Sequence, residues 1–425
     1  MWSAVIPALS LSLLWLIGIT IAFLLTRDHL VSRIFANVTR PLLLLFLIAL
    51  VVRLVPMILL PVGAAYDIES FRLVGEALLN GEDVYTSAAT GRHPYFPLQM
   101  YAVGTATYLS RTTSLPFVVW LKLPAVLADV CISVLIYISF RKWGRSETIS
   151  LSWALLYALN PIAILVSAYH GQFDSISVLL LLMAWYAWHF GAHIKRSAVF
   201  LGFAALNKSW PIVFLPIAFI RLTNNRQRLI YTLFALSIPA IFTAAYVILF
   251  SSDPTPMLRR ALTHSGVAGY WGASLIIYLL GNPFFDTAQI WPAVLSFQRI
   301  LILLVGLLTL WLTRRQSALD ALLTIILAIF AVTLGVGIQW LLWPLAFAVL
   351  ASERRWLQWY TIAGTFMMFV HLYGLHMYPW AGELLGTDQA NILVRISSLP
   401  VWIITVSWAV SRIRHVEGSP NPKRP

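Results

Sequence analysis

Long apolar runs, separated by short polar segments, most constrain how this chain can fold. Of its 425 residues, 60% are hydrophobic and 11% are charged, whereas about a quarter of the residues in soluble domains are charged. So few charges cannot cover a water-soluble surface. A bilayer core takes roughly 20 apolar residues of helix for each crossing. The sequence therefore predicts an all-α polytopic membrane protein whose main solvent is lipid.

The apolar runs predict about thirteen membrane segments, counted against that length. They are 4–25, 41–62, 117–139, 149–168, 174–191, 197–206 with 210–221, 229–250, 288–313, 318–335, 340–352, 357–378 and 395–413. The stretch 197–221 is interrupted by Asn207-Lys208-Ser209 and Pro211, which predicts two short helices that meet at a break buried in protein or lining a cavity. Residues 1–413 are thus expected to form one integral membrane domain, with a disordered tail at 414–425.

The distribution of charge predicts the orientation. By our count, 19 of the 29 Lys and Arg residues fall in loops on one side, and ten of the 16 acids fall on the other. The positive-inside rule then places the C-terminus in the cytoplasm, and the N-terminus and the acid-rich loops outside. The two largest outer loops are 63–115, with a short helix expected within it, and 251–287. Short loops and a short basic tail favour the plasma (inner) membrane of a bacterium.

Several classes of protein are excluded by what the sequence lacks. The net charge of +13 is spread over many loops, so we expect no nucleic-acid partner. The single cysteine, Cys131, excludes an internal disulfide and a multi-cysteine metal site. Neither a phosphate-binding loop nor an HExxH motif occurs, so no cofactor and no metal are predicted. A transferred group would have to arrive already activated, on a lipid carrier.

The first outer loop carries the carboxylates of interest. Asp67 follows a span directly, where it could serve as the N-cap of the next helix or as a general base at lipid head-group level. Glu69, Arg72 and Glu76 are three and four residues apart, as in a solvated ion-pair ladder; Glu69 could also contact an acceptor. Tyr95, in the Pro94-Tyr95-Phe96-Pro97 turn, could form a rigid re-entry to the membrane or contact the substrate on the acceptor side.

Several motifs occur together in one order along 60–350. They are Asp67 with Ala77-Leu-Leu-Asn-Gly81, Tyr85 and Pro94-Tyr-Phe-Pro-Leu98; Asn160-Pro161 with Tyr169-His-Gly-Gln-Phe-Asp-Ser175; Ala204-Ala-Leu-Asn-Lys208-Ser-Trp-Pro211 with Pro216; and Gln339-Trp-Leu-Leu-Trp-Pro344. This order resembles the GT-C glycosyltransferases, in particular the polyprenol-phosphate-mannose-dependent mannosyltransferases and their bacterial relatives. Trp340 stands where that family is expected to have tyrosine.

The resemblance implies a reaction and its partners. The donor would be a polyprenyl-phosphate-linked sugar, with mannose favoured, and the acceptor a hydroxyl of a glycolipid or glycan. The acceptor would attack the anomeric carbon and invert it, while the lipid phosphate leaves. The resemblance assigns the general base to the acid that opens the first outer loop, which here is Asp67.

Other polar residues are candidates for binding the donor phosphate or sugar, because cations stabilise the charge on a leaving phosphate. Lys208 could instead pair with Asp174, and Asp174 could cap a helix. Arg259 and Arg260 could instead be solvated, and His264 and His376 could be interfacial. Gln339 could join two helices. The candidates are Lys208, His170, Gln172, Asp174, Arg259, Arg260, Gln339 and His376, together with His264.

Two further expectations concern charge inside the membrane. Lys122, Asp129 and Arg53 are predicted to form a structural buried ion network. Broken helices and intramembrane charges also occur in transporters, so a lipid-linked sugar transporter or flippase is the main alternative. A non-catalytic lipid-binding subunit is the third, and it would not need Asp67.

Overall fold

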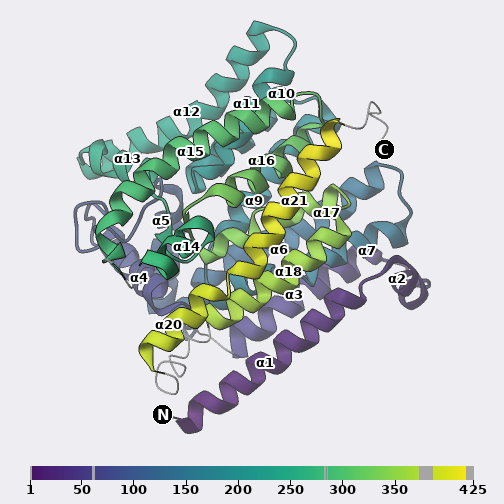
Figure 1. Ribbon diagram of the computed structural model, residues 1–425, viewed down its shortest axis with the longest axis horizontal. Coiled ribbons are helices and arrows are strands. Elements are labelled where there is room, and N and C mark those ends of the chain that lie inside the picture. Colours follow the sequence, from purple (N-terminus) through teal and green to yellow (C-terminus); the bar gives the residue numbers. More distant parts are fainter. Residues whose placement is uncertain (1, 60–62, 282–283, 285, 373–385, 418–425) are drawn as a thin grey trace. The chain divides into compact units, whose positions relative to one another are not determined.

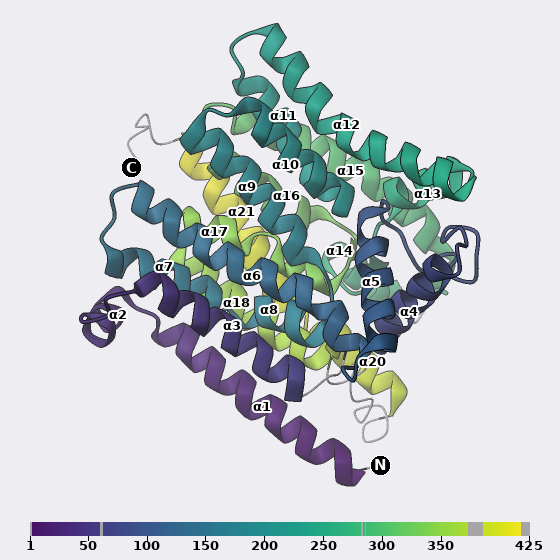
Figure 2. The same ribbon diagram turned by 180° about the vertical axis from the view of Figure 1, so that it is seen from behind.

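The computed structural model describes residues 2–59, 63–281, 284, 286–372 and 386–417, and most of them are helical (Figures 1 and 2). The chain divides into two compact units. The N-terminal unit comprises Ile6–His264, and the C-terminal unit comprises Ser265–Pro425 with Met1–Val5. The class predicted from the sequence, an all-α membrane protein, agrees with this helical architecture.

The elements of the N-terminal unit are helices and short helical turns. They are α1 (Trp2–Leu25), α2 (Asp28–Phe35), α3 (Pro41–Leu59), α4 (Ala65–Leu79), α5 (Leu98–Thr112), α6 (Phe117–Lys142), α7 (Glu147–Ala158), α8 (Pro161–Ile164), the π-helical turn η1 (Leu165–His170), α9 (Asp174–Gly191), α10 (Ile194–Asn207), the 3₁₀ turn η2 (Trp210–Val213), α11 (Phe214–Arg221), α12 (Asn225–Phe250) and α13 (Pro254–Thr263).

Capping side chains explain where several of these helices begin. The Ser146 hydroxyl accepts from the backbone N–H of Ile149 at the start of α7, 3.3 Å away. Asn160 accepts from Ile162 N at 3.0 Å, which begins α8. Asn224 begins α12 in the same way, and Asp253 begins α13. Each side chain satisfies a backbone donor that the first helical turn leaves unpaired.

The segment 63–115, predicted as an outer loop, contains two helices, although the sequence predicted only one. In α4, Gly75 lies against Thr107 of α5, and a Cβ on Gly104 of α5 would stand 2.5 Å from Leu78 Cδ2. Glycine at these two positions lets the helix axes approach closely, so α4 and α5 pack side by side (Figure 2). Their buried faces form one hydrophobic cluster with Leu121 of α6 and Phe173.

The predicted helix break at residues 207–209 is confirmed. Helix α10 ends at Asn207, Lys208 is extended with φ −145° and ψ 143°, and η2 then leads into α11. Helix α10 packs between α9 and α12, and the Asn207 amide donates to the Ser177 hydroxyl of α9 at 2.7 Å. The break thus brings Lys208 to the N-terminal end of α9.

The C-terminal unit consists of short and long helices around one two-stranded pairing. Its elements are β1 (Val267–Ala268), α14 (Gly272–Gly281), η3 (Thr287–Ile290), α15 (Trp291–Leu312), α16 (Ala318–Val332), β2 (Gly335–Val336), η4 (Ile338–Leu342), α17 (Leu345–Leu350), α18 (Arg354–His371), α20 (Thr387–Ile396) and α21 (Leu399–Glu417).

Two polar clusters hold the C-terminal unit together. Strands β1 and β2 are antiparallel, with Val267 opposite Val336, and the Gln298 side chain of α15 accepts from Leu334 N at 2.6 Å. Elsewhere, Arg412 of α21 bonds to Asp320 at 2.7 Å and to Glu353 at 2.6 Å. Because a buried guanidinium needs carboxylate partners, Arg412 joins α16, α18 and α21.

Five described helices are long and apolar enough to cross a membrane, or up to seven if each of two bent helix pairs counts as one span. One bent pair is α1 with α2, at 100°, and the other is α7 with the α8–η1 segment, at 47°. Residues 418–425, most of the predicted tail, and residues 373–378 of the predicted span 357–378 lie outside the described residues.

Candidate active site

The candidate site forms where the first turn of α4 meets the loop after η1. Asp67 lies in that first turn, and its side chain is 30% exposed. The loop His170-Gly171-Gln172 is buried beside it, and the two segments are joined through the backbone, since Ala64 N donates to His170 O at 3.2 Å. A Cβ on Gly63 would stand 3.1 Å from that oxygen, so glycine allows the close approach.

A π-helical turn delivers the loop to this position. In η1, Gly171 N donates to Val166 O at 3.2 Å, five residues back, and Gly171 has φ +89°. Such turns are rare and frequently lie at functional sites, and the left-handed backbone suits glycine. The chain therefore turns at Gly171, and the Gln172 side chain points toward α4.

Gln172 holds one oxygen of Asp67. Its Nε2 donates to Asp67 Oδ2 at 2.9 Å, and His170 Nε2 lies 3.6 Å from the same oxygen. Among the described residues, Asp67 Oδ1 has no hydrogen-bond partner. The carboxylate is thus fixed through one oxygen while the other stays open, as a group that accepts a proton requires.

Lys208 sets the direction of the Gln172 amide. Its ammonium donates to Gln172 Oε1 at 3.3 Å and to Asp174 Oδ2 at 2.6 Å. A lysine only donates and an ionised carboxylate only accepts, so the amide oxygen must face Lys208 and the amide nitrogen must face Asp67. The contact between Lys208 and Asp174, one of the two roles that the sequence allowed for Lys208, is present, and both side chains are buried.

Aromatic rings surround the lysine. The Lys208 ammonium lies 4.4 Å from the ring centroid of Phe173 and 4.8 Å from that of Tyr95, distances at which ring faces attract a cation. Tyr95 also contacts Phe173 and His264 edge to face. Tyr95, predicted as an acceptor-side residue, therefore reaches the site through its ring.

Burial keeps the Tyr95 hydroxyl and the His264 imidazole neutral. It raises the pKa of the Tyr95 hydroxyl, and the negative charges of Asp174 and Asp67 raise that pKa further. Burial lowers the pKa of His264 to about 4, and the positive charge of Lys208 contributes to the lowering. His264 is therefore a neutral imidazole near pH 7.

The alternative N-cap role of Asp67 and the proposed helix-cap role of Asp174 are both wrong. Helix α4 has Ala64 at its N-cap position and α9 has Phe173, and neither cap makes a side-chain hydrogen bond. Both carboxylates stand inside the first turn instead, where the helix dipole favours negative charge.

The remaining predicted residues lie outside this network. Glu69 is exposed on α4, with Arg72 at 3.9 Å, and the predicted ladder stops there because Glu76 pairs with Arg111 of α5. Arg259 and Arg260 lie on α13, where Arg260 approaches Gly91. Gln339 is buried in the C-terminal unit, and His376 lies outside the described residues.

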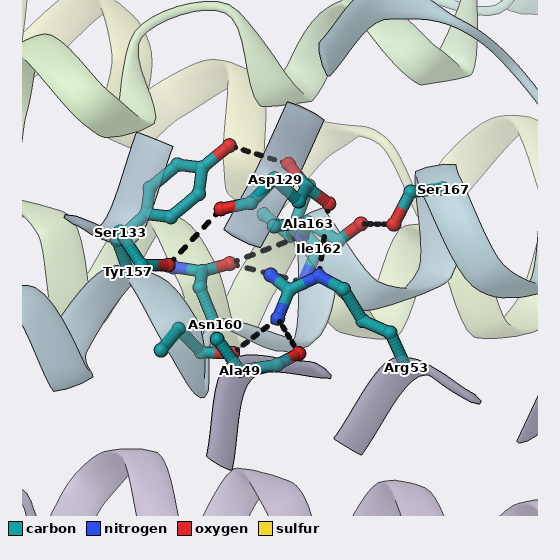
Figure 3. A network of polar contacts seen from close by, with 10 residues as sticks. Ala49, Arg53, Asp129, Ser133, Tyr157, Asn160, Ile162, Ala163 and Ser167 are labelled. Atoms are coloured by element: carbon teal, nitrogen blue, oxygen red, sulfur yellow. Dashed lines mark hydrogen bonds and ion pairs between the residues drawn. The ribbon is translucent and has the colours of Figure 1, made fainter. Parts of the chain in front are cut away.

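A second polar cluster lies deeper in the N-terminal unit (Figure 3). Arg53 Nε bonds to Asp129 at 3.1 Å, and the Tyr157 hydroxyl donates to the other oxygen of Asp129 at 2.7 Å. The predicted Arg53–Asp129 contact is confirmed, and it ties α3 to α6 and α7. Lys122, the third predicted member, is not part of this cluster. Its Cε lies 3.5 Å from the position that a Cβ on Gly171 would take.

Sequence reasoning passed over several contributors to the site. Phe173 was noted only as part of a motif, yet its ring supports Lys208. Nothing in the sequence marked Arg92, whose guanidinium lies 4.4 Å from the ring centroid of Tyr66.

A shallow hollow of about 640 Å³ lies by Arg40, Leu43 and Tyr137, and it contains none of the site residues.

No model of a known protein family matches this sequence, and no protein of curated function matches it.

Proposed function

We propose that the chain is an integral membrane glycosyltransferase. It moves a hexose, with mannose favoured, from a polyprenyl-phosphate sugar to an acceptor hydroxyl on the extracytoplasmic face. Asp67 is the general base. In this proposal the chain crosses the membrane with the thirteen segments predicted from its sequence, and the acid-bearing loops lie outside.

The observation that carries the proposal is the environment of Asp67. One carboxylate oxygen is held by Gln172 and the other has no partner within the described residues, on a side chain that is 30% exposed. A fully buried structural aspartate is expected to have both oxygens satisfied within the protein, whereas the partly exposed Asp67 leaves one oxygen open to a substrate. The fixed, half-open carboxylate is suited to receive a proton.

The reaction balances with one base. The acceptor oxygen forms the new bond to the anomeric carbon, and its proton passes to the open oxygen of Asp67. The bond from that carbon to the donor phosphate breaks on the opposite face, so the configuration inverts. The polyprenyl phosphate leaves with the electron pair and needs no second acid, because nearby donors stabilise its charge. His170 is a candidate for that contact.

Asp67→Asn tests the assignment. The amide keeps the size of the side chain but cannot take the proton, so transfer should fall by a factor of roughly 100 to 10,000. Expression and donor binding should stay near those of the wild type. The assay is sugar transfer by the purified protein from radiolabelled prenyl-phosphate sugars to mixed membrane lipids.

Glu76→Gln is the matched control, since Glu76 is a partly exposed carboxylate on the same helix whose partner is Arg111 of α5. Near-normal transfer by Asp67→Asn would end the assignment. Gradient-driven uptake into sealed vesicles without a covalent product would favour the transporter alternative instead.

A further inference from the structure

The shallow hollow by Arg40, Leu43 and Tyr137 has walls that are mostly apolar. Leu43 and Phe46 of α3 are three residues apart, as are Val134 and Tyr137 of α6, so each pair lies on one face of its helix. Leu43 is 48% exposed and Phe46 is 37% exposed. In a bilayer, the hydrocarbon chains of lipids cover such side chains. This part of the hollow therefore suits an acyl chain.

Two side chains of opposite charge line the same hollow. Arg40 directly precedes Pro41, the first residue of α3, and Glu147 is the first residue of α7. Among the described residues, Arg40 makes no ion pair, and the ion-pair partner of Glu147 is Arg141, at 4.0 Å. Because both members of that pair are exposed, it holds the carboxylate weakly. The hollow thus offers one cation and one anion that can each take a further partner.

The combination of these groups selects the chemistry of a ligand. The guanidinium of Arg40 can bind a phosphate through two parallel charge-assisted hydrogen bonds. The carboxylate of Glu147 only accepts hydrogen bonds, so it suits a primary ammonium better than a quaternary one, which has no N–H. A head group with negative charge alone would meet repulsion from Glu147. The ligand that matches is an amphiphile with a phosphate, a primary ammonium and a hydrocarbon chain.

We propose that this hollow binds one phospholipid with a phosphoethanolamine head group. The phosphate contacts Arg40, the ammonium contacts Glu147, and one acyl chain lies along Leu43 and Phe46. In the predicted orientation the lipid belongs to the cytoplasmic leaflet, because α3 begins on that side. The inference depends on the chain being a membrane protein, and it holds whether or not the chain transfers a sugar.

The test compares three lipids that have the same acyl chains, namely phosphatidylethanolamine, phosphatidylcholine and phosphatidylglycerol. The full-length protein is stripped of lipid in detergent and titrated with each lipid, and native mass spectrometry measures the binding of the first molecule. The variants are Arg40→Gln and Glu147→Gln. The matched controls are Arg33→Gln and Glu82→Gln, because both residues are exposed and neither lines the hollow.

We expect the wild type to bind phosphatidylethanolamine about tenfold more tightly than the other two lipids. Arg40→Gln should weaken the binding of phosphatidylethanolamine by a similar factor. Glu147→Gln should bring phosphatidylethanolamine to the level of phosphatidylcholine, because the ammonium then loses its charged acceptor. Both controls should keep the wild-type order. Equal binding of the three lipids by the wild type, tightest binding of phosphatidylglycerol, or an unchanged order in Glu147→Gln would overturn the inference.

A second measurement locates the lipid on the wild type and needs no variant. Phosphatidylethanolamine with a photoreactive group in one acyl chain should label the segments 41–46 and 134–137. An excess of unlabelled phosphatidylethanolamine should suppress this labelling, and the same excess of phosphatidylcholine should not. Equal labelling of α12 and α15, which are also apolar and mostly exposed, or equal suppression by both lipids would show an unselective lipid shell and refute the site.

Discussion

Gln172 is the residue on which the geometry of the proposed base depends. Its amide lies between a lysine that can only donate and a carboxylate that can only accept. Lys208 has its own charge neutralised by Asp174, so the lysine acts on Asp67 through the amide. We therefore assign Lys208 as a positioning residue in the proposed enzyme.

Lys208→Met should lower kcat by about one to two orders of magnitude, because a displaced carboxylate loses alignment with the acceptor. The KM of the donor should change little. The measurement is kcat and the donor KM, determined separately with prenyl-phosphate mannose for Lys208→Met and for the conservative variant Lys208→Arg. A large rise in the donor KM with kcat unchanged would instead assign Lys208 to the donor phosphate, as the sequence suggested.

Acid should destabilise the N-terminal unit through His93 and His264. Burial lowers the pKa of each to about 4, whereas an unfolded histidine titrates near 6.5. As pH falls from about 6.5 to about 4 the unfolded chain takes up protons first, so stability is lost across that window and not further below it.

Thermal unfolding at pH 7.5 and pH 4.5 checks this expectation. The His93→Gln/His264→Gln variant should lose less stability between the two pH values than the wild type, because glutamine does not titrate. The carboxylates are common to both proteins and cancel in the comparison. An identical loss in the two proteins would refute the assignment.

At the scale of elements, the contact between α4 and α5 is a tight interface. Gly75→Ala should lower the stability of the protein, although alanine favours a helix by about 1 kcal/mol over glycine, because its Cβ would overlap Thr107. Thr107→Ala should restore part of that loss. Gly306→Ala is the control, since nothing lies within 4 Å of the added carbon. Equal melting temperatures for Gly75→Ala and Gly306→Ala would contradict the packing.

The elements that the sequence predicted best are those with one strong local signal. The apolar runs located α3, α6 and α12 within a few residues, and Lys208 beside Pro211 located the break. Helix α5 was missed because its apolar positions alternate with polar ones and Pro97 precedes it, which indicated a loop. The π-helical turn before Gly171 was missed because its i to i−5 bonds depend on packing and have no residue signature.

The same distinction applies to the site. Asp67, Gln172 and Lys208 could be selected from the sequence because each is a polar residue at the end of an apolar run. Their pairing could not, since it requires knowing that η1 turns its last residues toward α4. Arg92 could not be selected either, because its partner Tyr66 lies 26 positions away and an arginine in a polar loop is unremarkable alone.

For the whole molecule, the proposed orientation makes a direct prediction about labelling. On a Cys131→Ser background, Ala88→Cys should react with a membrane-impermeant maleimide in intact cells, and Arg145→Cys should react only after the membrane is opened. Both positions are exposed, so a difference reflects the side of the membrane. Labelling of Arg145→Cys in intact cells would reverse the topology.

The main-chain bond from Ala64 to His170 affects how variants of this protein can be interpreted. Substitution replaces side chains and leaves the backbone N–H of Ala64 and the C=O of residue 170 in place. No variant at 67, 170 or 172 therefore removes either partner of this hydrogen bond. We therefore expect variants at these positions to keep the main-chain bond between the two segments. Loss of turnover in a variant that keeps this bond would point to missing side-chain chemistry and not to displaced loops.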